Sequence, residues 1–294
     1  MASGTNTLTA ATLSASDAKR GRPGVAALTR MELGKLRKRP MTKVTFGLGI
    51  LAAVGFMVLV LVAGTDGSRE AFVFPNIVED SFQLIQLMGN MTLPVIGAAI
   101  AGSEYGWGTM RLLLATGVGR GTLFAAKLLA LLVVDLLFVL MMAVLICVEA
   151  ACSGWLGGYE QDLSVIDGAW VADAVQLFAT TAGLLFFLVI VAFGVAMLGR
   201  SMAAGIAVGI GLPIAQQIAA VIAPAVFGRL GELMVDFFPN TSFQALAMRA
   251  GFDPAPAEGL LSPERAIATL VGYSVLILGV AALVFWRRDV PSGD

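Results

Sequence analysis

The chain has 294 residues, of which 58% are hydrophobic and only 13% are charged, and its formal net charge is -1. An ordinary soluble domain carries roughly 25% charged residues, so this composition excludes a soluble globular protein and favours a chain that lies mostly in lipid. Histidine is absent, which excludes imidazole-based catalysis. The two cysteines, Cys147 and Cys152, match no zinc or redox spacing. We interpret them as small apolar residues, with a disulfide as the less favoured alternative.

The N-terminal segment, residues 1–24, is rich in Ser, Thr, Ala and Gly and becomes basic toward its end. It has no apolar core of the kind that a cleavable signal peptide needs. We therefore expect a disordered cytosolic tail, followed by one transmembrane domain over residues 25–290.

Six apolar runs follow along the chain, and each is long enough to cross about 30 Å of hydrocarbon as a helix, which takes ~20 residues. The runs cover residues 44–63, 82–101, 123–151, 172–198, 202–223 and 266–286. The predicted fold is an all-α polytopic membrane protein with six transmembrane helices. An even number of crossings puts both termini on one side of the membrane.

The basic residues are distributed unevenly between the two sides that this topology defines. Fifteen lie on the side of the termini and four on the other side. Because loops rich in Lys and Arg stay in the cytoplasm, we expect both termini to be cytoplasmic and the protein to lie in the plasma membrane. The outer loops are acidic, which we interpret as solvation of the loops rather than as a cation site.

The segment between the second and third runs reads GSEYGWGTMRLLLATGVGR. If residues 104–114 form a helix, Glu104, Gly108 and Arg111 share one face, and Trp107 and Met110 fall on another. This division predicts a short interfacial helix, followed by a glycine-containing turn into the third run. Periodicity alone equally allows a surface loop without a partner.

The predicted third and fifth spans contain polar residues. Asp135 lies eight residues beyond Lys127, about 12 Å along a helix, and should face the bundle or water because a charge in lipid is costly. Gln216 and Gln217 follow Pro213, a predicted kink. For Asp135, Gln216 and Gln217, a structural contact and a place on the translocation path remain equally open.

We predict structural roles for three further residues. Gly205 and Gly209 form a small-x-x-x-small pair, which predicts close helix packing and leaves a dimer contact as an alternative. Glu149 lies near the outer end of the third run and is expected to reach water.

The connection between the fifth and sixth runs has the i, i+3, i+4 pattern of two short amphipathic helices separated by Pro239. Asn240, Thr241 and Ser242 offer an N-cap for the second helix. We expect both helices to lie at the outer leaflet, where they could plug the bundle, act as a lid, or do both.

The stretch GSEYGWGTMRLLLATGVGRGTLFAAKLL resembles the signature of ABC-2 type permeases, the membrane subunits of a class of ATP-binding cassette exporters. The lead-in TRMELGKLRKRP resembles the elbow helix of that family, and VFWRRDV resembles its C-terminal exit. The elbow departs from clean amphipathicity because three charged residues, Glu32, Lys35 and Arg39, fall on the same arc as the apolar Val25, Leu28 and Leu36.

The resemblance implies that residues 104–114 are the coupling helix, which docks on a separate ATPase subunit. The positions carried over are Glu104, Tyr105, Gly108, Thr109 and Arg111. The chain has no G-x-x-x-x-G-K-[ST] motif, so we expect no cofactor of its own, ATP bound by the partner, and no catalytic or metal-ligating residues.

The resemblance also implies a second permease copy or homologue as a partner, and no nucleic acid. Apolar walls with few charges favour export of a hydrophobic or amphipathic substrate, which is lipid-like, drug-like or a peptide. The alternatives are a secondary transporter or channel, and a membrane enzyme or assembly factor. The first predicts inverted repeats or several intramembrane charges, which the sequence lacks, and the absence of His argues against an enzyme.

Overall fold

The computed structural model of the chain describes residues 23–63, 74, 76–157, 161–249 and 261–287. The predicted disordered tail, apart from residues 23 and 24, and the last residues of the predicted domain lie outside the described residues. Within these ranges every regular element is a helix. The all-α prediction is confirmed for this part of the chain.

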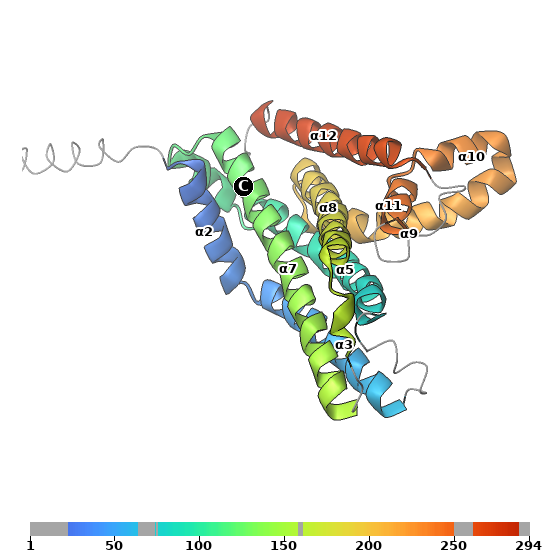
Figure 1. Cartoon of the computed structure of the whole chain (residues 1–294). Coiled ribbons are helices and arrows are strands. Elements are labelled where there is room, and N and C mark those ends of the chain that lie inside the picture. The colour runs from blue at the N-terminus through green and yellow to red at the C-terminus, as the bar shows by residue number, and fades with distance from the viewer. Residues whose placement is uncertain (1–22, 64–73, 75, 158–160, 250–260, 288–294) are drawn as a thin grey trace, which may run out of the picture.

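The N-terminal half contains α2 (Val25–Lys38), α3 (Pro40–Ala63), α5 (Asn76–Gly106), α6 (Thr109–Ala115) and α7 (Arg120–Gly157). Arg39 is extended between α2 and α3, and Pro40 begins α3, where a missing N–H costs nothing. The chain therefore turns a corner at residues 39 and 40. In Figure 1, α2 lies beside the first half of α7, and α3 continues past the corner toward the far end of α7.

The C-terminal half contains the 3-10 turn η1 (Leu163–Val165), α8 (Gly168–Gly199), α9 (Met202–Phe227), α10 (Arg229–Asp236), α11 (Pro239–Ala247) and α12 (Pro263–Arg287). Asp167 caps α8 by accepting a hydrogen bond from the Trp170 N–H at 2.8 Å. α8 lies in the centre and packs against α5, α9 and α12. Most of the second half of α8 is buried, which makes it the core helix of the bundle.

Four helices in the described part of the chain are long and apolar enough to span a membrane: Arg120–Leu156, Gly168–Gly199, Met202–Phe227 and Pro263–Arg287. They correspond to the predicted third to sixth runs. The first two predicted runs fall on α3 and α5, whose side chains are described only in part. The structure thus supports a multi-pass membrane protein and leaves the count of six as a proposal.

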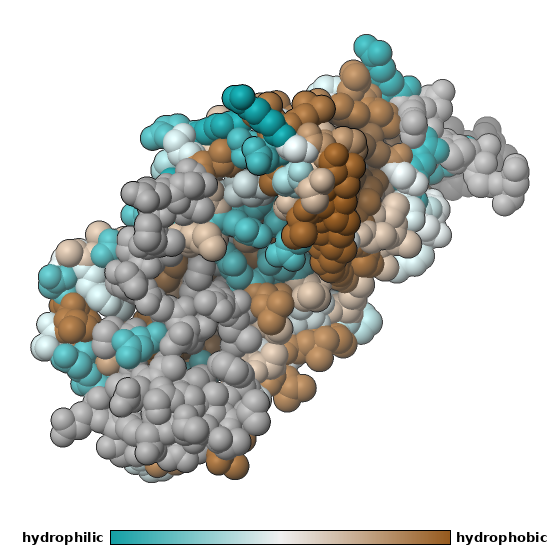
Figure 2. Space-filling view, turned by 90° about the vertical axis from the view of Figure 1, so that its right-hand side faces the viewer, coloured by the Kyte–Doolittle hydropathy of each residue, from teal (hydrophilic) through white to brown (hydrophobic). Residues whose placement is uncertain are grey.

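Hydrophobic side chains cover much of the outside of α9 and α12, for example Val221, Val226, Val275 and Leu276, each more than half exposed. Figure 2 shows a band of hydrophobic side chains beside hydrophilic side chains on one face of the molecule. A surface of this kind is stable in lipid and unfavourable in water. The exposed apolar surface agrees with the membrane location that composition predicts.

The two short helices expected between the fifth and sixth runs are present as α10 and α11. The predicted N-cap of the second is wrong, because α11 already begins at Pro239 and Phe238 is its capping position. Thr241 instead donates its hydroxyl to the Val235 carbonyl at 2.8 Å, which ties α11 back to α10.

Candidate functional site

The segment predicted as one interfacial helix over residues 104–114 is broken in two. α5 continues to Gly106, the chain turns at residues 107 and 108, and α6 begins at Thr109. Gly108 has a φ of 66°, a left-handed conformation that strongly favours glycine. Glu104 and Tyr105 therefore belong to the last turn of α5, whereas Thr109 and Arg111 belong to α6.

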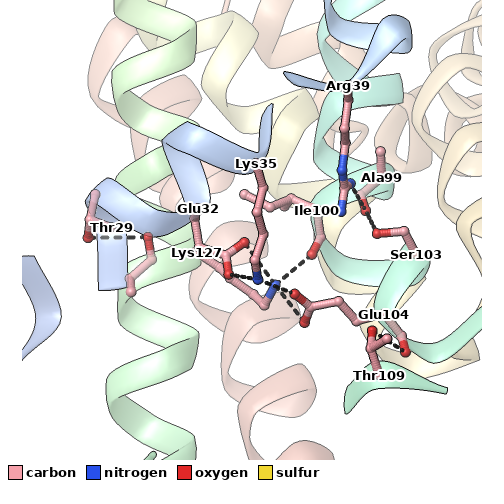
Figure 3. Close-up of polar contacts among 11 residues, drawn as sticks. Thr29, Glu32, Lys35, Arg39, Ala99, Ile100, Ser103, Glu104, Thr109 and Lys127 are labelled. Carbon is pink, nitrogen blue, oxygen red and sulfur yellow. Dashed lines mark hydrogen bonds and ion pairs between the residues drawn. The ribbon is translucent and has the colours of Figure 1, made fainter. Parts of the chain in front are cut away.

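Four charged side chains meet where α2, α5 and α7 come together, and we call Glu32, Lys35, Glu104 and Lys127 the buried charge cluster. The Lys35 ammonium lies 2.7 Å from Glu32 Oε1 and 2.8 Å from Glu104 Oε1. The Lys127 ammonium lies 3.2 Å from Glu32 Oε2 and 3.0 Å from Glu104 Oε2. Figure 3 shows the two lysines placed between the two carboxylates, so each charge has two opposite neighbours.

The cluster is withdrawn from solvent. Glu32 and Lys127 are each 1% exposed and Glu104 is 3% exposed, whereas Lys35 remains 31% exposed. Lys127 also donates to the Ile100 carbonyl at 2.9 Å. Isolated buried charges would be very costly, so the balance of two acids and two bases is what makes this burial tolerable.

Glu104 and Lys35 illustrate the electrostatics of the cluster. Burial by itself would raise the pKa of the Glu104 carboxyl, but Lys127 and Lys35 beside it outweigh that effect and hold its pKa below the usual range. Burial likewise works to lower the pKa of Lys35, and the hydrogen bonds and charges of Glu104 and Glu32 outweigh it and raise the pKa. Both groups are therefore charged at neutral pH.

This cluster accounts for the irregular face of α2 seen in the sequence. Leu28, Glu32 and Leu36 are the buried residues of α2, so two apolar side chains and one carboxylate share its packed face. Glu32 and Lys35 interrupt the apolar face because, besides pairing with each other, they meet Glu104 and Lys127, which lie 69 or more positions away in the chain. In the sequence, the only sign of this cluster is the presence of charged residues on a helix face that is otherwise apolar.

Thr29 in α2 and Arg39 just after it make three further contacts. The Arg39 guanidinium donates to the Ala99 carbonyl at 3.0 Å and lies 5.2 Å from the centroid of the Trp107 ring. Thr29 Oγ1 is 3.4 Å from the Ala126 carbonyl of α7. The end of α5 and the start of α7 are thus both held against α2 (Figure 3).

Among the residues predicted for the coupling helix, one side chain is buried and the others are partly or fully exposed. Glu104 is buried in the cluster, and Tyr105 is half-buried with the Arg200 guanidinium 6.0 Å from its ring centroid. Thr109 and Arg111 are exposed. Trp107 and Leu112 are not among the predicted site residues, yet they are 68% and 70% exposed at the same corner.

Gly102 allows α5 to touch the corner between α8 and α9. A Cβ at Gly102 would lie 2.4 Å from the Met202 nitrogen and 2.7 Å from its Cα. The corner itself is formed by Arg200, whose φ is 51°, and by Ser201, which caps α9 through its hydroxyl. The end of α5 therefore contacts α2, α7 and the start of α9.

Arg120 connects the start of α7 to the end of α12. Its guanidinium donates to the Phe285 carbonyl at 2.9 Å and to the Trp286 carbonyl at 3.0 Å. These carbonyls belong to the last turn of a helix, where they have no partner within the helix and carry the negative end of its dipole. The predicted glycine turn before α7 is present, with Gly117 at a φ of 80°.

Asp135 is fully buried in α7, as expected of an acid that avoids lipid. Neither of its carboxylate oxygens has a hydrogen-bond partner among the described residues. The two glutamines diverge: Gln216 accepts from the Asn240 N–H of α11 at 3.1 Å, whereas Gln217 is exposed. Pro213 lies within α9, which continues on both sides of it.

Close helix packing within the chain accounts for the pair Gly205 and Gly209. A Cβ at Gly205 would lie 2.6 Å from the Ala192 carbonyl oxygen, and one at Gly209 would lie 2.7 Å from Pro94 Cβ. Both glycines therefore admit close packing of α9 on α5 and α8.

Cys147 and Cys152 are free thiols. Glu149 is 3% exposed, so the expectation that it reaches water is wrong in this structure.

Comparison with known proteins adds the family. The model of the ABC-2 family transporter proteins matches residues 28–216, more than half of the chain. The chain belongs to this family. Its match begins in α2 and ends in α9, so it covers the charge cluster and the α5–α6 corner of this ABC-2 permease. A search of curated proteins found no match.

Proposed function

We propose that this ABC-2 permease is the non-catalytic membrane subunit of an ATP-driven exporter, with six spans, cytoplasmic termini and a separate ATPase that binds ATP. In this proposal α2 is the elbow helix, and the corner formed by the end of α5 and by α6 docks on the ATPase. The protein lies in the plasma membrane and works with a second permease copy or homologue.

The observation that carries the proposal is the contrast between the two sides of the α5–α6 corner. Its outer side exposes Trp107, Arg111 and Leu112. Its inner side is held through Glu104 to Lys35 of α2 and Lys127 of α7. Trp and Arg are residue types enriched where protein partners bind, and the exposed Leu112 adds apolar area beside them. A displacement of this corner by a bound partner would be transmitted to α2, α5 and α7 together.

The structure suggests different roles within the group of site residues. Glu104 is too deeply buried to contact a partner, so we assign it to positioning the corner. Gly108 permits the turn between α5 and α6. Arg111 would contact the ATPase, with Trp107 and Leu112 beside it, and Thr109 supports the turn through a 3.5 Å contact of its hydroxyl with the Glu104 carbonyl.

The proposed substrate class is hydrophobic or amphipathic. It is supported by the apolar composition and by the absence of any group of three or more metal-ligating residues among the described side chains. Asp135 and Gln216 are the polar side chains that we propose to lie along or near the path, while exposed Gln217 would lie at its margin or face another subunit.

The test is co-expression of the permease with its ATPase subunit, followed by co-purification and measurement of vanadate-sensitive ATP hydrolysis. Trp107→Ala and Arg111→Ala should each reduce recovery of the ATPase about tenfold or more, as expected of interface hot spots. Arg111→Ala should leave the thermal stability of the isolated permease unchanged because the side chain is exposed, and Trp107→Ala should lower it only slightly, through loss of the contact with the Arg39 guanidinium.

Leu163→Ala is the matched control, since Leu163 is 63% exposed in η1, on the side proposed to be extracellular. Unchanged ATPase recovery with Trp107→Ala and Arg111→Ala would remove the docking role of the corner. A permease that is stable alone and binds no ATPase would instead favour a transporter, channel or assembly factor without a motor.

A further inference from the structure

A cavity of about 370 Å³ lies where the end of α2 and the start of α3 face α7. Its walls are made by six apolar side chains from all three helices: Leu33, Leu36, Phe46, Val133, Val134 and Leu137. The volume falls within the ~300–1,000 Å³ of ordinary ligand sites. Its outer edge is open, because Val133 and Leu137 are 36% and 52% exposed.

The polar residues that line the cavity are Arg37, Thr42 and Lys43, and no lining residue is acidic. Arg37 and Lys43 are exposed and make no ion pair with any described residue. This distinguishes them from Lys35 and Lys127, whose charges are balanced in the buried cluster. The cavity therefore combines an apolar slot with two uncompensated positive charges on its rim.

The position of the cavity along α3 matches a membrane boundary. After Lys43, residues 44–63 carry no charge, and 20 helical residues extend about 30 Å, the thickness of the hydrocarbon layer. Arg37 and Lys43 would then lie at head-group level, with the apolar slot open toward the acyl chains. Lys and Arg at this level are attracted to anionic lipids.

We propose that this cavity is a binding site for an anionic phospholipid of the membrane. One acyl chain occupies the slot against Phe46, Val134 and Leu137, and the phosphate is held by Arg37 and Lys43. Arginine suits this role because its planar guanidinium can donate two parallel hydrogen bonds to phosphate oxygens. Thr42 supplies a hydroxyl donor beside them.

Occupancy would bear on the buried charge cluster, because both sites are built between α2 and α7. The lipid would fill the space beyond the last turn of α2 and support its packing on α7. It would thus help to keep Glu32 and Lys35 in contact with Lys127. The leaflet in which this lipid would lie follows from the proposed topology, which belongs to the proposed function. The choice of an anionic lipid as the ligand follows only from the residues that line the cavity.

The experiment uses the full-length permease purified in detergent, without the ATPase, and native mass spectrometry to count retained lipid. Phosphatidylglycerol is the anionic probe and phosphatidylcholine, with the same acyl chains, is the zwitterionic probe. The wild type should retain phosphatidylglycerol in preference. Arg37→Gln with Lys43→Gln should reduce that retention by about tenfold or more, as loss of two basic contacts implies.

Arg30→Gln with Lys38→Gln is the matched control, because it removes one Arg and one Lys that are exposed on the same helix and do not line the cavity. It should leave retention unchanged. Leu137→Trp, which narrows the slot and leaves the charges in place, should reduce retention of the anionic lipid as well.

If both double variants lost the same amount of bound phosphatidylglycerol, retention would reflect a general attraction of the lipid to basic residues at the surface, and the proposed site would be overturned. Equal retention of the two lipids by the wild type, or unchanged retention in Leu137→Trp, would overturn it too. These readings do not involve the ATPase or the sidedness of the termini. Failure of the lipid site is therefore distinguishable from failure of the proposed coupling function.

Discussion

Lys127 is the residue on which the end of α5, α2 and the start of α7 depend most directly. It is 1% exposed, and its ammonium contacts Glu32, Glu104 and the Ile100 carbonyl. Removing one partner from a buried ion-pair cluster leaves an uncompensated charge, which costs more than the pairing itself contributes. Lys127 is therefore a positioning residue, because its contact with Glu104 holds in place the corner that carries Trp107 and Arg111.

Lys127→Met is expected to lower the free energy of unfolding by about 3–5 kcal/mol, because two buried carboxylates would then share only Lys35. Adding Glu104→Gln to the same chain should recover part of that loss, since Glu32 and Lys35 would remain as a balanced pair. Equilibrium unfolding of the purified protein in mixed micelles measures both changes.

Lys38→Met is the control for this comparison. Lys38 is exposed at the end of α2, so its replacement should change the stability by no more than about 0.5 kcal/mol. A Lys127→Met protein as stable as this control, or a double variant less stable than Lys127→Met, would contradict the role assigned to the cluster.

At the scale of elements, the end of α5 is positioned by two different kinds of contact. The charge cluster fixes it to α2 and α7, and the missing side chain of Gly102 lets it touch the corner between α8 and α9. The second contact is steric: the atoms nearest to a Cβ at Gly102 belong to the backbone of Ser201 and Met202, which cannot rotate away. Close packing of this kind transmits displacement between helices.

Gly102→Ala is expected to destabilise the protein by about 1–3 kcal/mol, because the added methyl would force α5 and α9 apart. Gly106→Ala makes the same change four residues later in α5, where nothing lies within 4 Å of the added Cβ. That substitution should be neutral or stabilising by up to about 1 kcal/mol. Thermal unfolding of both variants in the same detergent checks the difference, and similar melting behaviour would argue against the close approach.

At the scale of the whole molecule, the proposed topology puts the turn after α6 on one side of the membrane and η1 on the other. Thr116 and Ser164 are exposed at these two places. α7 lies between them, and its 38 residues extend about 57 Å as a helix, more than enough to cross the hydrocarbon layer.

Single cysteines at these positions test the orientation. In a chain carrying Cys147→Ser and Cys152→Ser, a membrane-impermeant maleimide added to intact cells should label Ser164→Cys and should not label Thr116→Cys. Permeabilised cells should allow both to be labelled, which confirms that each thiol is accessible. Labelling of Thr116→Cys in intact cells would reverse the proposed orientation.

Local patterns determined much of the fold from the sequence. The apolar runs at residues 123–151, 172–198, 202–223 and 266–286 each fall within one long helix of the structure, because a backbone in lipid must satisfy its hydrogen bonds within the same segment. The two short helices around Pro239 followed from periodicity. The family was indicated by the ordered residues of one short stretch and is shown by the family match.

Tertiary structure decided what the residues of that stretch do. From the sequence, Glu104 and Arg111 shared one face of a single helix, but the left-handed turn at Gly108 gives them separate helices, so that Glu104 is buried and Arg111 is exposed. The partners of Glu104 lie on α2 and α7, and local periodicity carries no information about pairing between distant helices. Composition and hydropathy thus determined by themselves that this chain belongs in lipid as a set of helices. Which charges are buried together, and which side chains face outward, depended on the packing of α2, α5 and α7 because a buried charge is stable only where its partners are brought to it.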